Sequence, residues 1–296
     1  MDIKSDKNSF IINEYLNPGY LTDKTGNELN SNFIYNKWMK RGVELYNKRN
    51  YDKAMEYFRK SINIIEECHQ AWMYQGLVQG KYKQFDKAVE CFNQALMIKP
   101  DYTEAINHKG YILTNLRHYE TALKCFDTVI KLKPDFYQAH DLRGFILVRM
   151  ENIEEAIKSF DKAIEIKPKY LQTYDNKGYA LNIIGKYEEA ITNFNHVIKM
   201  NRVYYQAWTN KAFALNKLNK YIDSIYCSSE ALRINPNCIN AYYNRACSYS
   251  LLDNKENMLS DLKEAINRDI ECKAKARKDE DFKAYWSDSD FKRLVK

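Results

Sequence analysis

The chain has 296 residues, of which 45% are hydrophobic, so it can build a core and wholesale disorder is excluded. Its 46 basic and 39 acidic residues leave a net charge of +7, and the most basic stretches, 35–68 and 273–296, each carry only +3, which argues against nucleic acid as the main partner. The first residues are polar and the apolar runs are too short to span a bilayer, so we expect a cytoplasmic protein with no membrane partner.

Residues 1–34 form an N-terminal extension that does not share the pattern of the remaining chain. The segment FIINEYL, residues 10–16, is typical of a short helix, and NPGY is typical of a turn. We expect a partly flexible extension that covers the start of the regular part of the chain. The alternative is that the extension folds into a binding groove in place of a ligand.

From residue 35 onward the sequence repeats with a period of 34 residues. Small, aromatic and proline positions all keep this step: Gly42, Gly76, Gly110, Gly144 and Gly178; Phe58, Phe92, Phe126, Phe160 and Phe194; Pro100, Pro134, Pro168 and Pro236. The period defines seven registers: 35–68, 69–102, 103–136, 137–170, 171–204, 205–238 and 239–272.

Each register predicts two helices. In the fourth, QAHDLRGFILVRM and IEEAIKSFDKAIEI both place apolar residues three and four apart, and a proline then ends the second helix. The glycine column lets the two helices approach closely, and the phenylalanine column fills the space beside that contact. A single hairpin cannot bury its apolar face, so seven hairpins stack into one solenoid.

The residues that carry this period resemble the tetratricopeptide repeat. WMKRGVEL with Ala54 and Phe58 is one example, and WMYQGLVQ with Ala88, Phe92 and Pro100 is another. The resemblance covers residues 35–272 and implies an all-α, right-handed α-solenoid of helix-turn-helix hairpins. Residues 273–296 are similar to the C-terminal cap of such proteins, and we expect Phe282, Trp286 and Phe291 to cover the last helix face.

No pattern of catalytic or metal-ligating residues is found. Six of the seven cysteines recur at two repeat positions, Cys91, Cys125 and Cys227 at one and Cys68, Cys238 and Cys272 at the other, and no C-x-x-C is present. In-phase cysteines from stacked repeats lie too far apart for a disulfide. The five histidines form no i, i+4 pair. We therefore expect no enzyme activity, no metal site and no cofactor.

The resemblance implies that the second, fifth, sixth, ninth, twelfth and thirteenth positions of each register line a concave groove. Aromatic side chains there offer apolar contact, and amides can donate to and accept from a peptide backbone. Four aromatics, three asparagines, three glutamines and two aspartates are the candidate groove residues: Tyr111, Phe145, Tyr179, Phe213, Asn176, Asn210, Asn244, Gln138, Gln172, Gln206, Asp141 and Asp175.

These residues indicate a non-catalytic scaffold or adaptor that binds a protein or peptide segment. Co-chaperones with this repeat grip a terminal carboxylate with Lys at the fifth and Asn at the ninth position, then Lys at the second and Arg at the sixth. No register here has these residues, so a chaperone carboxylate clamp is not expected. Three alternatives stay open: a receptor for a small signalling peptide, a single-stranded RNA-binding solenoid that stacks bases on its aromatic row, and an enzyme accessory subunit.

Overall fold

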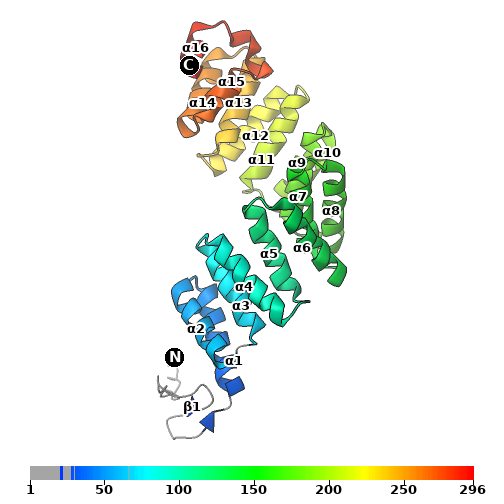
Figure 1. Ribbon diagram of the computed structural model, residues 1–296. Helices are drawn as coiled ribbons and strands as arrows, with labels where there is room; N and C mark the ends of the chain where they lie inside the picture. Colours follow the sequence, from blue (N-terminus) through cyan, green and yellow to red (C-terminus); the bar gives the residue numbers. More distant parts are fainter. Residues whose placement is uncertain (1–20, 23–27, 30, 66) are drawn as a thin grey trace, which may run out of the picture. The chain divides into compact units, whose positions relative to one another are not determined.

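The computed structural model describes residues 21–22, 28–29, 31–65 and 67–296, in two compact units, Met1–Ala139 and His140–Lys296 (Figure 1). The expected helix at 10–16 lies outside the described residues. Two short strands, β1 (Leu21–Thr22) and β2 (Glu28–Leu29), pair antiparallel before the first helix. The repeat pattern did not predict this pair.

Two helices form in every register. The first helices are α1 (Ser31–Asn47), α3 (His69–Lys81), α5 (Thr103–Asn115), α7 (Tyr137–Arg149), α9 (Leu171–Ile183), α11 (Tyr205–Lys217) and α13 (Ile239–Leu251). The second helices are α2 (Tyr51–Ile64), α4 (Phe85–Ile98), α6 (Tyr119–Leu132), α8 (Ile153–Ile166), α10 (Tyr187–Met200), α12 (Tyr221–Ile234) and α14 (Lys255–Arg268). The prediction of an all-α solenoid of helical hairpins is confirmed.

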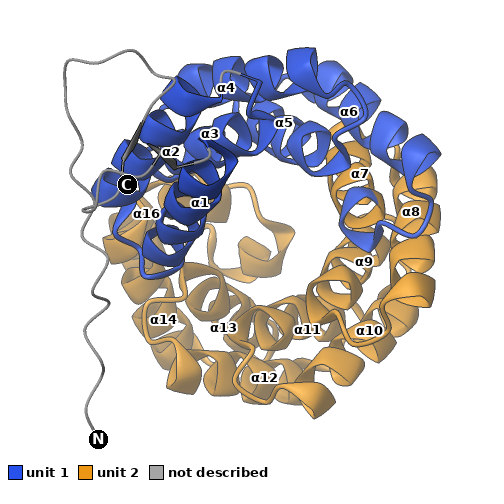
Figure 2. Ribbon diagram, turned by 90° about the horizontal axis from the view of Figure 1, so that it is seen from below, with its two compact units in different colours: residues 1–139 blue, residues 140–296 orange. Residues whose placement is uncertain are grey.

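Each unit has an inner and an outer layer of helices. Figure 2 shows α1, α3 and α5 on the inner side of the first unit and α2, α4 and α6 outside them. In the second unit α9, α11 and α13 lie on the inner side, with α8, α10, α12 and α14 outside. The surface that the first helices form within a unit is called its inner face below. No helix of the described residues is long and apolar enough to cross a bilayer.

The glycine and phenylalanine columns meet inside each hairpin, as predicted. A Cβ added to Gly144 would lie 2.6 Å from Cε1 of Phe160, and Phe160 is fully buried. Four other pairs repeat this contact. In the sixth register the glycine becomes Ala212, and the phenylalanine becomes Ser228. The larger residue in one column is thus matched by a smaller one in the other.

The turn between the two helices of each hairpin requires a left-handed residue. Positive φ values recur every 34 residues, at Arg49, Lys83, Arg117, Glu151, Gly185, Asn219 and Asp253. The second helices end just as regularly. Lys99 is extended before Pro100, as the residue before a proline tends to be, but Asn201 is equally extended before Arg202. The second helices therefore end at the same repeat position even where no proline follows.

A C-terminal cap closes the last repeat. It consists of α15 (Glu271–Ala276), a 3-10 helix η1 (Glu280–Tyr285) and α16 (Ser289–Val295). Phe282 and Phe291 are buried with Met258 and Leu262 of α14, and Trp286 packs partly buried against the same cluster. The expectation that these three aromatic residues cover the last helix face is confirmed.

Candidate peptide-binding surface

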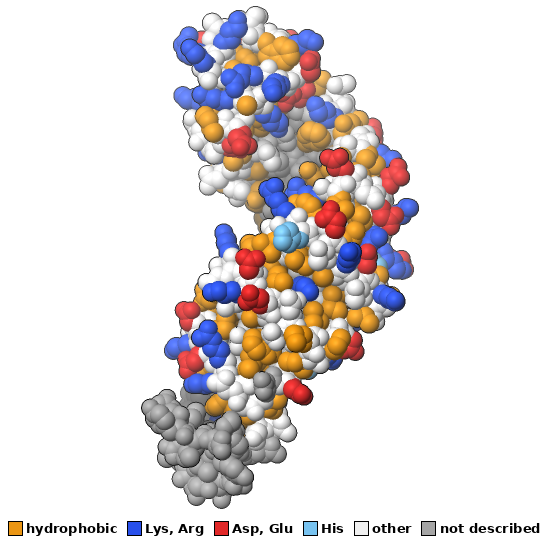
Figure 3. Space-filling view, in the orientation of Figure 1, with side chains coloured by type: hydrophobic (Ala, Val, Ile, Leu, Met, Phe, Trp, Pro, Cys, Tyr) orange, Lys and Arg blue, Asp and Glu red, His pale blue; other side chains and the backbone are white. Residues whose placement is uncertain are grey.

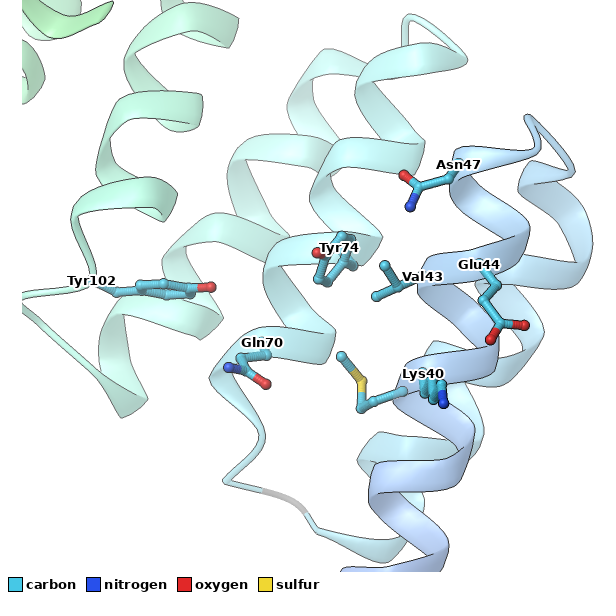
Figure 4. Close-up of a pocket in the computed structure, with 8 residues that line it drawn as sticks. Lys40, Val43, Glu44, Asn47, Gln70, Tyr74 and Tyr102 are labelled. Atoms are coloured by element: carbon cyan, nitrogen blue, oxygen red, sulfur yellow. The ribbon is translucent and has the colours of Figure 1, made fainter. Parts of the chain in front are cut away.

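A hollow of about 350 Å³ opens on the inner face of the first unit (Figure 4). Met39, Lys40 and Val43 of α1 line it together with Gln70 and Tyr74 of α3; Glu44, Asn47 and Tyr102 complete the lining. The Tyr74 ring points toward Val43 in Figure 4, and the same ring stacks on buried Phe58 at 5.1 Å between centroids. The hollow therefore has a fixed aromatic wall, with the Lys40 side chain at its margin.

The lining of this hollow follows the repeat. Met39, Lys40 and Val43 occupy the fifth, sixth and ninth positions of the first register, and Gln70 and Tyr74 occupy the second and sixth of the next. These are positions that the family resemblance implies for the groove. They lie together because residues three and four apart share one face of a helix, and successive first helices lie side by side.

The aromatic candidates at the ninth position lie on first helices in both units. Tyr111 belongs to α5 of the first unit and is 49% exposed, whereas Tyr179 and Phe213 of the second unit are 46% and 37% exposed. Phe145 is half-buried, and the Arg149 guanidinium lies over its ring at 5.1 Å. These rings offer apolar surface on the inner face that a ligand can cover.

The asparagine candidates connect neighbouring first helices. Asn176 of α9 donates to Oδ1 of Asp141 at 3.2 Å, and Asn210 of α11 donates to Oδ1 of Asp175 at 3.2 Å. Asn244 of α13 donates in the same way to the carbonyl oxygen of Thr209 at 3.1 Å. Each bond joins a sixth position to the fifth position of the preceding repeat. Sequence reasoning placed these residues in columns but missed the bonds between the columns.

The glutamine candidates lie at the starts of their helices. Gln138 is half-buried on α7, and Gln172 and Gln206 are exposed on α9 and α11. Gln172 donates to Oδ1 of Asn176 at 3.0 Å and accepts from the Tyr204 hydroxyl at 2.7 Å. These contacts orient the Gln172 amide and join it to the Asn176 amide on the same helix.

The two aspartate candidates are buried without a cation. Asp141 is 5% exposed and Asp175 is 7% exposed, and no ion pair involves either carboxylate among the described residues. Burial raises the pKa of both carboxyls, against the hydrogen bonds from Asn176 to Asp141 and from Asn210 to Asp175. The pKa of Asp175 rises to about 6. Buried carboxyl groups with a raised pKa are typical of functional positions, so these two residues are candidates for contact with a ligand.

The C-terminal cap covers the inner face at the last repeat. Cys247, the ninth-position residue of the seventh register, is 3% exposed, and burial raises the pKa of its thiol well above the ordinary value. Its sulfur lies within 4.8 Å of carboxylate oxygens of Asp279 and Asp281. Tyr243 donates to Asp279 at 2.9 Å, and Lys217 pairs with Asp281 at 3.4 Å. These two carboxylates therefore fasten the cap to α11 and α13.

Charged side chains of both signs are interspersed over the outside of each unit in the view of Figure 3. Lysines and arginines gather densely on the C-terminal cap in this view. Within the cap, Lys275 of α15 lies over the Tyr243 ring at 3.9 Å. Acidic residues lie in the same region. Asp288 of the cap, for example, pairs with Lys255 of α14 at 2.6 Å. This mixture is typical of a solvated surface.

The chain belongs to the tetratricopeptide repeat family. Family matches cover residues 38–68, 69–102, 103–136, 137–170, 171–204 and 239–269, each described as a tetratricopeptide repeat. The fold of this family is a scaffold for protein–protein interaction, and its members are typically non-catalytic. No curated protein shows a significant match to the chain.

Solved structures with the same fold share little sequence with it. A tetratricopeptide repeat protein from Parabacteroides merdae is 17% identical, with a TM-score of 0.65 over 88% of this chain and 98% of that one. The Cut9–Hcn1 hetero-tetramer of the APC/C gives 14% identity and a TM-score of 0.69 over 86% of this chain and 48% of that one. YrrB, described as having an unusual peptide-binding site, gives 17% identity and 0.51 over 62% and 95%. At these identities the likeness establishes the fold alone.

Proposed function

We propose that this protein is a non-catalytic adaptor that binds an extended peptide segment on the inner face of its first helices. The observation that carries the proposal is the hollow of the first unit, which is lined by side chains from the groove positions of two successive repeats. The exposed rings of Tyr179 and Phe213 support the same use of the inner face in the second unit. YrrB, a protein of the same fold with an unusual peptide-binding site, is consistent with this function.

The affinity that each contact can supply determines how many repeats a bound peptide must engage. Burying an apolar side chain fully contributes about 1.5–3 kcal/mol, and a hydrogen bond adds about 0.5–1.5 kcal/mol. Micromolar binding requires about 8 kcal/mol. Two aromatic contacts and a few amide contacts reach that range before the entropy of ordering the peptide is subtracted. A bound segment therefore has to engage several repeats at once.

Single-stranded RNA is the second candidate ligand, because a cation accompanies two of the exposed or half-exposed rings. Arg149 lies over Phe145, and Lys217 lies 5.8 Å from the Phe213 centroid. In each pair a base could stack on the aromatic ring while the neighbouring cation contacts a phosphate. However, Asp141 and Asp175 lie on the same inner face, and their charges would repel a phosphate backbone. A peptide therefore fits the second unit better.

The proposal can be tested by selecting binders from a displayed library of random peptides. Wild-type protein is compared with the double variant Tyr179→Ser, Phe213→Ser, and with Ile222→Ser as a control. Ile222 is an apolar side chain on the outer helix α12 and, at 69% exposed, is more open than either groove ring. We expect peptides recovered by the wild type to bind the control equally and the double variant at least about tenfold more weakly.

Circular dichroism establishes that each variant keeps its helices, so that a loss of binding reports the surface. Equal binding of the recovered peptides to the double variant would reject the second-unit inner face as the site. Binding of poly-uridine in place of peptides, with a steep loss on added salt, would favour the RNA alternative.

A further inference from the structure

The inner face of α9 carries a buried carboxylate and an open ring one helical turn apart. Asp175 is 7% exposed and Tyr179 is 46% exposed, and residues four apart project from the same side of a helix. On the basis of the proposed function, we propose that the second unit recognises a basic side chain of the bound peptide, Lys or Arg. Its cationic head pairs with Asp175, and its stem and charge lie against the Tyr179 ring.

A residue of the next repeat orients the Asp175 carboxylate, and within the described part of the chain only one of the two carboxylate oxygens accepts a hydrogen bond. Asn210 donates to Oδ1, and the structure gives Oδ2 no hydrogen bond from the described residues. Oδ2 is not a fully buried atom, so a ligand group can reach it, and an ammonium or guanidinium group there supplies both a donor and the compensating charge. A neutral donor could bond to that oxygen but would leave the charge of the carboxylate uncompensated, and an acidic ligand would be repelled.

The corresponding positions four repeats earlier already form a hollow. Asp175 corresponds to Met39 and Tyr179 to Val43, while Gln206 corresponds to Gln70. Met39 is 7% exposed, which matches the exposed fraction of Asp175. The same backbone pattern thus presents a thioether and an isopropyl group in the first unit but a carboxylate and a phenol in the second. The two faces differ in the chemistry that they offer a ligand.

The cations of the second-unit inner face do not neutralise Asp175. Lys217 is paired with Asp281 of the cap, and Arg149 lies over Phe145. On α9 itself the thirteenth position, where α7 and α11 carry those cations, is Ile183. Asp141 of α7 adds a second buried carboxylate to the same face. The positive charge that complements these carboxylates is therefore expected to come from the ligand.

An aromatic ring beside the carboxylate strengthens this preference. A Lys or Arg cation over the face of a tyrosine ring is favoured electrostatically, and the long side chain covers apolar surface at the same time. The structure records no ring or cation contact for Tyr179 among the described residues, in contrast to Phe145 and Phe213. Tyr179 is thus the ninth-position ring of the second unit that is free to receive a ligand cation.

The test is a selection from a displayed random peptide library on three proteins: wild type, Asp175→Asn and Asp223→Asn. The first substitution removes the charge but keeps an acceptor for Asn210. The second is the matched control, because Asp223 lies exposed on the outer helix α12. We expect wild type and control to recover peptides that share a Lys or Arg, and Asp175→Asn to recover peptides without this shared residue.

The recovered peptide is then synthesised with citrulline or norleucine in place of the shared basic residue. We expect this change to weaken binding to the wild type about tenfold or more, and binding to Asp175→Asn less than about twofold. Recovered peptides with no shared basic residue, or an equal loss in both proteins, would overturn the assignment while the proposed peptide-binding function stands. Failure of the wild type to recover any peptide would overturn the proposed function itself.

Discussion

Replacing Asp175 by Asn removes a charge from the inner face but keeps an oxygen that can accept the amide of Asn210. Burial raises the pKa of Asp175 from an ordinary value of 3.8 to about 6, so folding disfavours its charged form. A group whose pKa is raised by folding stabilises the protein most when it is protonated, and this contribution is lost as the pH rises through the folded-state pKa. The isosteric amide has no charged form. We therefore expect Asp175→Asn to stabilise the protein at neutral pH.

The size of the effect follows from the shift in pKa. Two pKa units correspond to about 3 kcal/mol, and a weaker hydrogen bond from Asn210 to the neutral amide reduces the gain to about 2–3 kcal/mol. At about pH 4.5 the native carboxyl of the wild type is already largely protonated, so the difference falls to about 1 kcal/mol or less. Tyr204 interacts electrostatically with this carboxyl and with Asp141, and both residues are present in both proteins. Their contributions largely cancel in the comparison.

The assay is thermal unfolding followed by far-ultraviolet circular dichroism at both pH values, with Asp223→Asn as the exposed control. We expect the melting temperature of Asp175→Asn to exceed that of the wild type by about 5–10 °C near pH 7.5 and by a much smaller margin near pH 4.5. The control should change it little at either pH. A gain that does not depend on pH, or a loss at neutral pH, would refute the reasoning that this carboxylate is buried at a cost in stability.

The packing and turns of the repeat and the packing of the C-terminal cap give three further predictions. Each is checked by denaturant unfolding, and the last is also checked by amide exchange. Gly144→Leu should wedge its hairpin open against Phe160, lower the free energy of unfolding by several kcal/mol and loosen the adjacent repeats; an unchanged melt would show that the close contact is absent. Gly185→Ala should lower the free energy of unfolding by about 1 kcal/mol, because a φ of +76° is unfavourable for a residue with a Cβ and no neighbouring atom crowds the site. Glu151 occupies the corresponding turn one repeat earlier, and an equal loss of stability for Glu151→Gly would contradict this explanation. Phe282→Ala should cost about 3–5 kcal/mol and first unfold the C-terminal cap, detected as faster amide exchange in η1 than in α3.

Most of the helical architecture could be predicted because the repeat period, the columns of small and aromatic residues and the helical spacing all agree. Gly144 and Phe160 are sixteen residues apart in sequence, and the hairpin turn brings them together as expected. The strand pair of Leu21–Thr22 and Glu28–Leu29 could not be predicted in this way. It lies outside the repeat, and two-residue strands have no periodicity of their own.

The site was predicted less completely than the fold. The columns that line the hollow of the first unit were predicted, but the contacts within the second unit were not. Asn176 and Asn210 were expected to offer their amides to a ligand, whereas their Nδ2 groups donate to the aspartates of the preceding repeat. A single-sequence pattern shows which residues recur at one position, but not which hydrogen bonds join one position to another. Their contact with a ligand stays a prediction.

The burial of the aspartates was also invisible in the sequence. Asp141 and Asp175 stand at positions that read as part of an open groove, yet both are more than nine-tenths buried by the neighbouring helices. Burial depends on how closely successive first helices pack, and this distance is set by side chains of three repeats together. For the same reason the sequence did not show that the cap shields Cys247.

The central claim is that a peptide binds on the inner face, and site-specific photo-crosslinking tests it most directly. A photoreactive phenylalanine derivative replaces Tyr179 on inner helix α9 in one protein and Ile222 on outer helix α12 in another; both side chains are exposed. Each protein is irradiated with a peptide recovered by the wild type. We predict a crosslink from position 179 that excess unlabelled peptide abolishes, and none from position 222. A specific crosslink from position 222 alone would contradict the account and move the binding surface to the outer helices.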